Sequence, residues 1–285
     1  MADSRKSVVI SGASTGIGAA CALDLAKHGF RVFAGVRDPD DGRRLEQLGN
    51  GAIQALPLDV TTAADIAAAA AAVEKAVGPQ GLWGLVNNAG IAVIGPLELV
   101  PIEDLRQQLE VNLIGHVAMI QAMLPWLRVA RGRIVNIGSF NGFMSPPYFA
   151  PYAASKYAME AITDSLRVEL RTWGIGVSIV EPGSTDTPIW RKSGDISARM
   201  SSSVSAERMQ LYEKDLKAVR DTAEKLAKTA MPVRRVTWAV RHALSVTRPR
   251  TRYPVGLEAR LAMRLARLLP DFVRDWLVMR GLGLQ

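Results

Sequence analysis

Short apolar runs alternate with segments of helical periodicity along the first part of the chain. Residues 7–11 form an apolar run with β-branched side chains, and residues 30–36 form a second one. Between them, apolar residues recur on one helix face: Ile17, Ala19, Ala20, Leu23 and Leu25. This order predicts strand, tight turn, helix and strand, which is a βαβ unit. Strands that continue to alternate with helical stretches over 285 residues indicate one α/β domain without a linker.

Other helical patterns follow. An alanine-rich stretch, residues 63–72, lies between a threonine pair and Gly78-Pro79, and we expect a capped surface helix there. Near the end of the chain, Arg260, Arg264 and Arg267 alternate with leucines, and aromatic residues follow. This pattern predicts a basic amphipathic helix that is broken at Pro270.

The first predicted strand is joined to the first helix by the turn Ser-Gly-Ala-Ser-Thr-Gly-Ile-Gly, residues 11–18. Gly12, Gly16 and Gly18 have the spacing G-x-x-x-G-x-G, one residue longer than the common dinucleotide fingerprint. Glycine permits backbone geometry closed to other residues, and it lets a pyrophosphate approach the positive start of the helix. We therefore predict a dinucleotide site. The alternative is a purely structural corner.

The end of the second strand indicates which dinucleotide binds. An acidic residue there holds the ribose 2′-hydroxyl, whereas an arginine accommodates a 2′-phosphate. The chain reads Gly35-Val36-Arg37-Asp38, so an apolar strand tip is followed by a basic residue. We predict NADP(H), bound by Arg37. NAD(H) is the alternative, because Asp38 becomes the ribose ligand if the strand ends one residue later.

The sequence Tyr152-Ala-Ala-Ser-Lys156 places a phenol and an ammonium four residues apart. On a helix both side chains lie on one face, where the ammonium favours the phenolate. A free tyrosine has a pKa of about 10 and needs such help to transfer protons near neutral pH. The spacing also occurs by chance, but the glycine turn upstream favours a catalytic pair.

Further motifs follow in a fixed order: Leu58-Asp59-Val60, Asn87-Asn88-Ala89-Gly90, Asn112, Ser139, and Pro182-Gly183 with Thr187. Together with the glycine turn and the Tyr152 motif, they resemble the short-chain dehydrogenase/reductase family over residues 7–190. Two departures are small, since Ser11 replaces the usual threonine and Gly138-Ser139 replaces a frequent Ser-Ser. The resemblance implies a Rossmann-type doubly wound parallel sheet, as a single domain with a helical substrate-loop insertion and C-terminal amphipathic helices.

The resemblance also assigns roles to residues. Its catalytic residues are Asn112, Ser139, Tyr152 and Lys156. Tyr152 would be the general acid and base, Ser139 would bind the substrate oxygen, and Asn112 would hold a water linked to Lys156. The cofactor residues, including those from the turn and strand arguments, are Gly12, Ser14, Thr15, Gly16, Ile17, Gly18, Arg37, Asp59, Val60, Asn88, Ala89, Gly90, Tyr152, Lys156, Pro182, Gly183, Thr185 and Thr187.

Within the family, residues 32–37, 83–88 and 252–256 look like the branch of retinol, hydroxysteroid and 3-hydroxybutyrate dehydrogenases. The core at 7–190 is followed by an expected substrate loop at 190–231, where the family pattern gives out, and by a helical extension at 257–285. The expected substrate-contacting residues are mostly apolar or aromatic: Ser139, Met144, Tyr148, Phe149, Tyr152, Trp190, Met209 and Tyr212. We therefore expect a bulky apolar substrate.

Composition argues against several other classes of protein and site. The net charge is +8, but the basic residues are dispersed without interleaved aromatic residues, so nucleic-acid binding is not expected. Three scattered histidines, His28, His116 and His242, predict no metal site. The single cysteine, Cys21, permits no internal disulfide and fits a reducing compartment. We see no leader and no run of about eighteen apolar residues, so we expect a cytoplasmic protein.

The sequence allows several partners for the C-terminal helix. The basic C-terminal helix packs over the substrate mouth, packs against another subunit, or contacts anionic lipid at a membrane surface. Related folds pair through long helices, here about 103–128 and 152–173, so we expect a homodimer or homotetramer.

The sequence as a whole predicts an NADP(H)-dependent oxidoreductase that moves a hydride to or from an alcohol or carbonyl group. The alternatives are an NAD(H)-dependent hydroxy-acid or small-alcohol dehydrogenase, a non-catalytic dinucleotide-binding sensor or scaffold, and a peripheral membrane protein.

Overall fold

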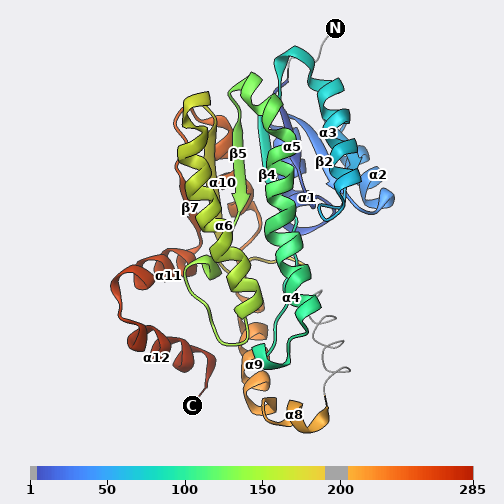
Figure 1. Ribbon diagram of the computed structural model, residues 1–285. Coiled ribbons are helices and arrows are strands. Elements are labelled where there is room, and N and C mark those ends of the chain that lie inside the picture. Colours follow the sequence, from blue (N-terminus) through green and yellow to red (C-terminus); the bar gives the residue numbers. More distant parts are fainter. Residues whose placement is uncertain (1–4, 190–204, 285) are drawn as a thin grey trace.

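The computed structural model describes residues 5–189 and 205–284. In this part of the chain, parallel strands form one sheet in the order β3-β2-β1-β4-β5-β6-β7 (Figure 1). The strands are β1 (Ser7–Ile10), β2 (Arg31–Val36), β3 (Ile53–Pro57), β4 (Gly84–Asn87), β5 (Arg133–Ile137), β6 (Gly176–Pro182) and β7 (Arg252–Val255). The strand order reverses between β1 and β4. In such sheets the crevice beyond the carboxyl ends of these strands is the usual ligand site.

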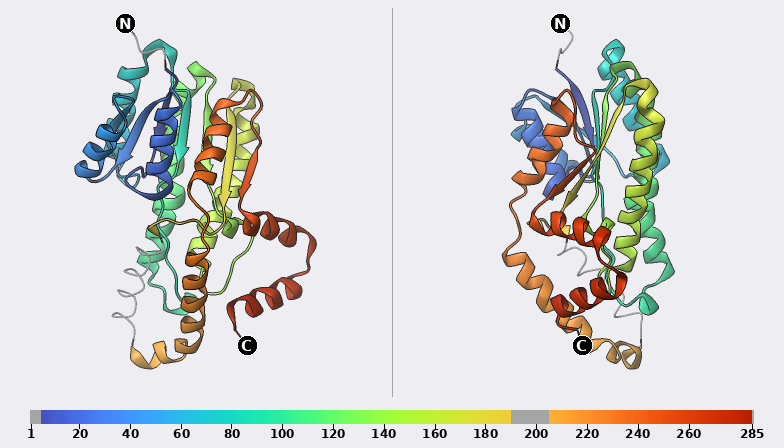
Figure 2. Two further views of the ribbon diagram at one scale, coloured as in Figure 1. Left: turned by 180° about the vertical axis from the view of Figure 1, so that it is seen from behind. Right: turned by 90° about the vertical axis from the view of Figure 1, so that its left-hand side faces the viewer.

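Helices cover both faces of the sheet (Figure 2). One face carries α1 (Gly16–Lys27), α2 (Pro39–Leu48) and α10 (Arg234–Ser245), and the other carries α3 (Ala63–Val77), α5 (Gly115–Ala130) and α6 (Ala150–Glu169). Each face has its own apolar core, which explains why the strands are near-continuous apolar runs. The predicted βαβ start and the doubly wound parallel sheet are confirmed.

The long helix predicted at about 103–128 is interrupted. It consists of α4 (Ile102–Leu109), a π-helical turn (Glu110–Ile114) and α5. This run, residues 102–130, is long and apolar enough to span a membrane, with a mean hydropathy of 1.3 over 18 residues. Met119, Met123 and Leu127 of α5 are nevertheless fully buried in the core beside the sheet, as in the core helix of a globular fold.

The alanine-rich helix also differs from the prediction. It extends to Val77, and Thr62 occupies the N-cap position without a side-chain capping bond. It is more than a surface helix, because Ile66, Ala69 and Val73 are buried in the core against α5.

The remaining described helices lie beyond the carboxyl edge of the sheet (Figures 1 and 2). They are α8 (Ala206–Gln210) and α9 (Glu213–Lys228) in the expected substrate region, and α11 (Leu257–Leu268) and α12 (Asp271–Leu282) in the C-terminal extension. The break at Pro270 occurs as predicted. Short 3-10 turns occupy Gly78–Gln80, Leu97–Leu99, Phe140–Gly142 and Leu170–Trp173.

Candidate active site

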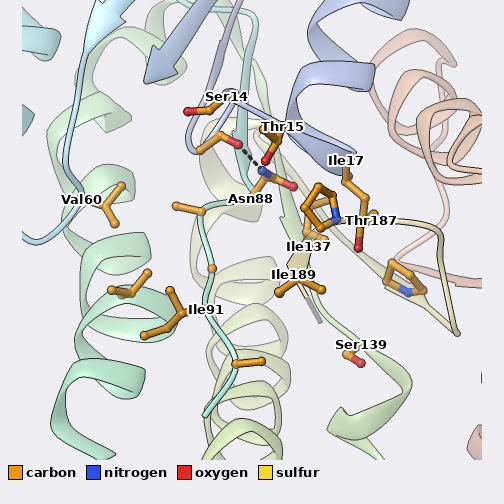
Figure 3. Close-up of a pocket in the computed structure, with 18 of the residues that line it drawn as sticks. Ser14, Thr15, Ile17, Val60, Asn88, Ile91, Ile137, Ser139, Thr187 and Ile189 are labelled. Atoms are coloured by element: carbon orange, nitrogen blue, oxygen red, sulfur yellow. Dashed lines mark hydrogen bonds between the residues drawn. The ribbon is translucent and has the colours of Figure 1, made fainter. Parts of the chain in front are cut away.

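A cleft runs along the carboxyl ends of the strands, from Arg37 after β2 to Tyr152 on α6. Figure 3 shows part of its lining, including Asn88, Ile91 and Ser139. All predicted cofactor residues except Gly18 line it: Gly12, Ser14, Thr15, Gly16, Ile17, Arg37, Asp59, Val60, Asn88, Ala89, Gly90, Tyr152, Lys156, Pro182, Gly183, Thr185 and Thr187. The cleft also includes residues that the sequence did not single out, among them Ile91, Phe140 and Ile189. The signal that could have identified them is their position, because each follows the carboxyl end of a strand that borders the cleft.

The glycine turn has the backbone that its spacing predicts. Gly12 and Gly16 adopt φ values of +64° and +58°, which favour glycine. A Cβ atom on Gly12 would lie 2.7 Å from the Cα of Ala89, so this close approach requires glycine. Gly18 does not line the cleft. A side chain there would collide with the Gly12 carbonyl, so this glycine lets the helix pack on the turn.

Two polar side chains tie the turn to the end of β4. The Ser11 hydroxyl accepts hydrogen bonds from the backbone N–H groups of Asn88 (3.0 Å) and Ala89 (3.1 Å). In return, the Asn88 amide donates to the carbonyls of Ser11 (3.1 Å) and Gly12 (2.9 Å), below Ser14 and Thr15 in Figure 3. Asn88 therefore shapes the cradle as well as lining it. Ser11 supplies a hydroxyl where the family usually has a threonine.

At the far end of the cleft, Arg37 and Asp38 have different roles. Arg37 lines the cleft with its side chain 73% exposed, and its Nη1 lies 3.9 Å from Asp59 Oδ2. Burial opposes ionisation of Asp59, but hydrogen bonds from Thr61 and the charge of Arg37 give a net lowering of its pKa. Asp38 instead caps α2, because its carboxylate accepts from the N–H of Asp40 (2.8 Å). A second arginine, Arg44, donates to the Ser14 carbonyl (2.7 Å).

Ser139, Tyr152 and Lys156 meet at the other end of the cleft. Ser139 follows β5, and its hydroxyl caps the 3-10 turn by accepting from the N–H of Asn141 (3.2 Å). Tyr152 and Lys156 lie one turn apart on α6, with Nζ 5.6 Å from the phenol ring centre. The Lys156 ammonium donates to the Ile137 carbonyl (2.9 Å), which fixes it at the carboxyl end of β5.

Burial controls the protonation of this pair. It raises the pKa of Tyr152 to about 12, although a hydrogen bond with Ser139 acts in the opposite direction. It lowers the pKa of Lys156 to about 8, against the attraction of Glu160. The sequence predicts a tyrosine whose pKa is lowered by the lysine, whereas in the structure burial of the phenol raises the pKa of Tyr152. The neutral phenol is the form that can donate a proton.

Asn112 lies in the π-helical turn and is fully buried. Its amide donates to the Ile91 carbonyl (3.0 Å) and the Ser155 hydroxyl (3.1 Å), while its oxygen accepts from the Ile91 N–H (2.9 Å). Ser155 in turn donates to the Tyr152 carbonyl (2.7 Å). Asn112 is thus linked to the tyrosine helix through Ser155, a residue inside the predicted motif that the sequence analysis did not assign. π-helical turns frequently mark functional sites.

The predicted substrate residues are only partly brought together. Ser139 and Tyr152 line the cleft, and Trp190 lies outside the described residues. The others do not line this cleft and are half-buried beyond it: Met144, Tyr148, Phe149, Met209 and Tyr212.

The two tyrosines of that group connect α8 and α9 to the body of the protein. Tyr148 donates to Asp215 on α9 (2.7 Å), and Tyr212 donates to Glu98 (2.5 Å). Their rings meet edge to face, with centres 6.4 Å apart. They therefore form a structural link next to the cleft, whatever their part in substrate contact.

Comparison with known proteins agrees with this geometry. The sequence model of the short chain dehydrogenase family matches residues 6–197. The chain is 38% identical to 17-beta-hydroxysteroid dehydrogenase type 6 of Bos taurus over 97% of its own length and 88% of that protein. It is 35% identical to retinol dehydrogenase 7 of Mus musculus over 95% of its length and 86% of that protein.

Solved structures match as well. A short chain dehydrogenase from Burkholderia cenocepacia, in complex with NADP, superposes with a TM-score of 0.71 at 27% identity, covering 99% of both chains. A 3-ketoacyl-(acyl-carrier-protein) reductase from Brucella melitensis, complexed with NADH, has a TM-score of 0.62 at 29% identity and covers 65% of this chain and 77% of that one.

Proposed function

The chain belongs to the short-chain dehydrogenase family, and on that premise we propose that it is an NADP(H)-dependent enzyme for bulky apolar alcohols or ketones. As a member of this family it is an oxidoreductase acting on CH–OH groups with NAD(P). The observation that carries the finer proposal is the convergence of Ser139, Tyr152 and Lys156 on one end of a cleft whose other end is lined by Arg37.

The cleft residues fit a dinucleotide. Gly12 and Gly16 of the turn line the cleft at the start of α1, where backbone N–H groups and the helix dipole suit a pyrophosphate. Val60 and Asp59 would contact the adenine, and Thr185 and Thr187 with Pro182 would hold the nicotinamide end. When bound, the cofactor supplies the hydride chemistry.

The protein supplies orientation and a proton. In the reducing direction, the neutral Tyr152 phenol donates its proton to the substrate oxygen as the carbonyl carbon gains a hydride. Ser139 donates a hydrogen bond to the same oxygen and stabilises the negative charge that develops on it. The charged Lys156 stabilises the phenolate that remains, and the Asn112 region would return the proton from solvent. Oxidation of an alcohol uses the same steps in reverse.

Support for NADP(H) comes from the positions and hydrogen bonds of the side chains at the far end of the cleft. Arg37 lines the cleft and is exposed, so its guanidinium can reach a 2′-phosphate, while the Asp38 carboxylate is engaged in capping α2. Arg44, next to Ser14, would add a second positive charge nearby.

The test is a fluorescence titration of NADPH and NADH binding. We expect wild type to bind NADPH more tightly, and Arg37→Ala to weaken NADPH binding by roughly tenfold or more while leaving NADH binding unchanged. Arg106→Ala is the matched control, because Arg106 is an exposed arginine that is paired with Glu103 and does not line the cleft. Tighter binding of NADH by wild type would contradict the proposal and favour the NAD(H) alternative.

The substrate proposal rests on the lining near Ser139. Among the described residues of the cleft, the charged ones are Arg37 and Asp59 at one end and Lys156 at the other. Lys156 is bonded to the Ile137 carbonyl beside Tyr152, and no other described lining residue at that end is a cation that could pair with a substrate carboxylate. Ile91, Phe140 and Ile189 offer apolar walls. Relatives named as hydroxysteroid and retinol dehydrogenases support a steroid-, retinoid- or lipid-like substrate over a small hydroxy acid.

The proposed enzyme is a homodimer or a homotetramer. A groove between α5 and α6 is lined by Leu124, Ile162 and Trp173, with Arg128 and Glu169 of opposite charge beside them. Two copies related by a two-fold axis could pair this face with itself. Sedimentation equilibrium tests it, and a monomer at micromolar concentration would contradict it.

The C-terminal extension would contact an anionic membrane surface peripherally, without spanning it. Phe272 and Trp276 of α12 are 74% and 56% exposed, and Leu261 of α11 is half exposed. The exposed Arg260 and Arg264 lie on the same extension, in a chain of net charge +8. Exposed apolar and basic side chains together suit an anionic lipid surface.

A further inference from the structure

A cluster of charged groups, buried at Glu160 and Glu181 and partly exposed at Asp164, lies behind the candidate active site. Arg252 of β7 bonds through Nη1 to Glu160 of α6 and to Glu181 of β6 (3.0 Å). Its Nη2 bonds to Asp164 of α6 (2.8 Å), which also pairs with Arg167. The arginine thus joins the last two strands of the sheet to the helix that carries Tyr152 and Lys156.

Glu160 touches both parts of the site. It lies one helical turn after Lys156, and it packs against the turn that follows Ser139. A Cβ atom on Gly142 would lie 2.9 Å from Glu160 Cγ, and one on Gly138 would lie 3.4 Å from Glu160 Oε1. No side chain fits between Glu160 and this turn. Glu160 Oε1 is itself buried and has no hydrogen-bond partner among the described residues.

The cluster holds three carboxyl groups around one guanidinium. Burial and the neighbouring Glu160 raise the pKa of Glu181 to about 8, and Glu181 is fully buried. The protonated form of Glu181 is therefore favoured relative to that of an ordinary glutamate. Glu160, whose pKa is also raised by burial, is held toward the charged form by Arg252 and Lys156.

Two other titratable groups near Lys156, His116 and Tyr152, carry no negative charge at neutral pH. Burial lowers the pKa of His116, on α5, to about 3, so this imidazole is neutral. Tyr152 on α6 is neutral because burial raises its pKa to about 12. Within the described part of the chain, Glu160 is the acidic group whose charge opposes the loss of the Lys156 proton.

We propose that Glu160 is a positioning residue for the reaction: its carboxylate, anchored by Arg252, keeps Lys156 protonated and supports the turn that presents Ser139. This inference rests on the proposed function, because a charged Lys156 matters only if Tyr152 transfers the proton. Glu160 itself does not line the cleft. It acts through Lys156 and Ser139.

The direct test is the titration of Lys156, followed by NMR on protein with 13C-labelled lysine, where the Lys156 signal is the one missing in Lys156→Arg. In Glu160→Gln we expect the Lys156 pKa to fall by about one unit, since an attractive charge is removed without loss of volume. Asp164→Asn is the matched control, because it removes another carboxylate from Arg252 on the same helix and should leave Lys156 unchanged. An unchanged Lys156 pKa in Glu160→Gln overturns the inference.

The kinetic readout separates positioning from a merely structural role. The alkaline limb of kcat for ketone reduction should move to lower pH in Glu160→Gln by the same amount as the Lys156 pKa, and Glu160→Asp should restore most of it. A uniform loss of activity with the limb unmoved overturns the inference. If Glu160→Gln does not fold, Glu160→Asp provides the test, with a smaller fall in the same direction expected and no fall overturning it.

The two failures are distinguishable. The NMR titration needs no turnover, so it judges Glu160 even when no substrate reacts. Turnover that survives Lys156→Met would instead overturn the proposed function, whatever the NMR shows.

Discussion

Single hydroxyl and amide groups shape the cofactor cradle. Ser11 is fully buried and accepts two backbone hydrogen bonds that join the glycine turn to Asn88 and Ala89. The sequence predicts these residues from their order in a motif. Their actual contacts were not predictable, because Ser11 and Asn88 are 77 residues apart and meet only when β1 pairs with β4.

Removing this hydroxyl should weaken both folding and cofactor binding. Ser11→Ala removes the partner of the buried Ala89 N–H and the part-buried Asn88 N–H, so we expect the free energy of unfolding in urea to fall by roughly 1–3 kcal/mol. NADPH affinity should fall as well, because the turn loses its tie to β4. Ser11→Thr keeps the hydroxyl and should behave like wild type. Equal free energies of unfolding for the Ala and Thr variants would show that these hydrogen bonds contribute nothing to stability.

At the scale of elements, the alternation of strands and helices was predictable and the special elements were not. Residues 110–114 have the composition of an ordinary helix, and the π-helical turn arises where Asn112 bonds to Ile91 and Ser155 from other segments. The Glu160–Arg252 contact likewise depends on β7 pairing with β6. The positions of α8 and α9 could not be inferred, because the family pattern ends before them.

These two helices are held to the body partly by Tyr148, a non-glycine residue with φ of +71°. Tyr148→Phe removes the hydrogen bond to Asp215 and should loosen α9. We expect KM for a bulky ketone to rise roughly two- to tenfold, with a smaller effect on a small ketone. The exposed Tyr157 provides the control, since Tyr157→Phe should change neither constant. A Tyr148→Phe variant with unchanged KM values would separate this link from substrate binding.

At the scale of the whole molecule, charge and exposed apolar surface gather on the C-terminal extension. In a flotation assay we expect the protein to bind vesicles containing anionic lipid more than neutral vesicles, and to dissociate as salt rises. Arg260→Glu with Arg264→Glu should reduce this binding. The control pair, Arg43→Glu with Arg106→Glu, makes the same charge change elsewhere on the exposed surface and should matter less. Equal loss in both pairs would point to net charge instead of a defined surface.

Tyr152 is the proposed proton donor, and the proposed reaction depends on it more than on any other residue. The decisive measurement is turnover of a panel of hydrophobic ketones with NADPH by wild type and Tyr152→Phe, with NADPH affinity measured in parallel. We predict a loss of roughly 10²–10⁴-fold in kcat with NADPH affinity nearly unchanged, because the phenylalanine keeps the buried ring and removes the proton. A Tyr152→Phe variant that reduces ketones at the wild-type rate would contradict the account.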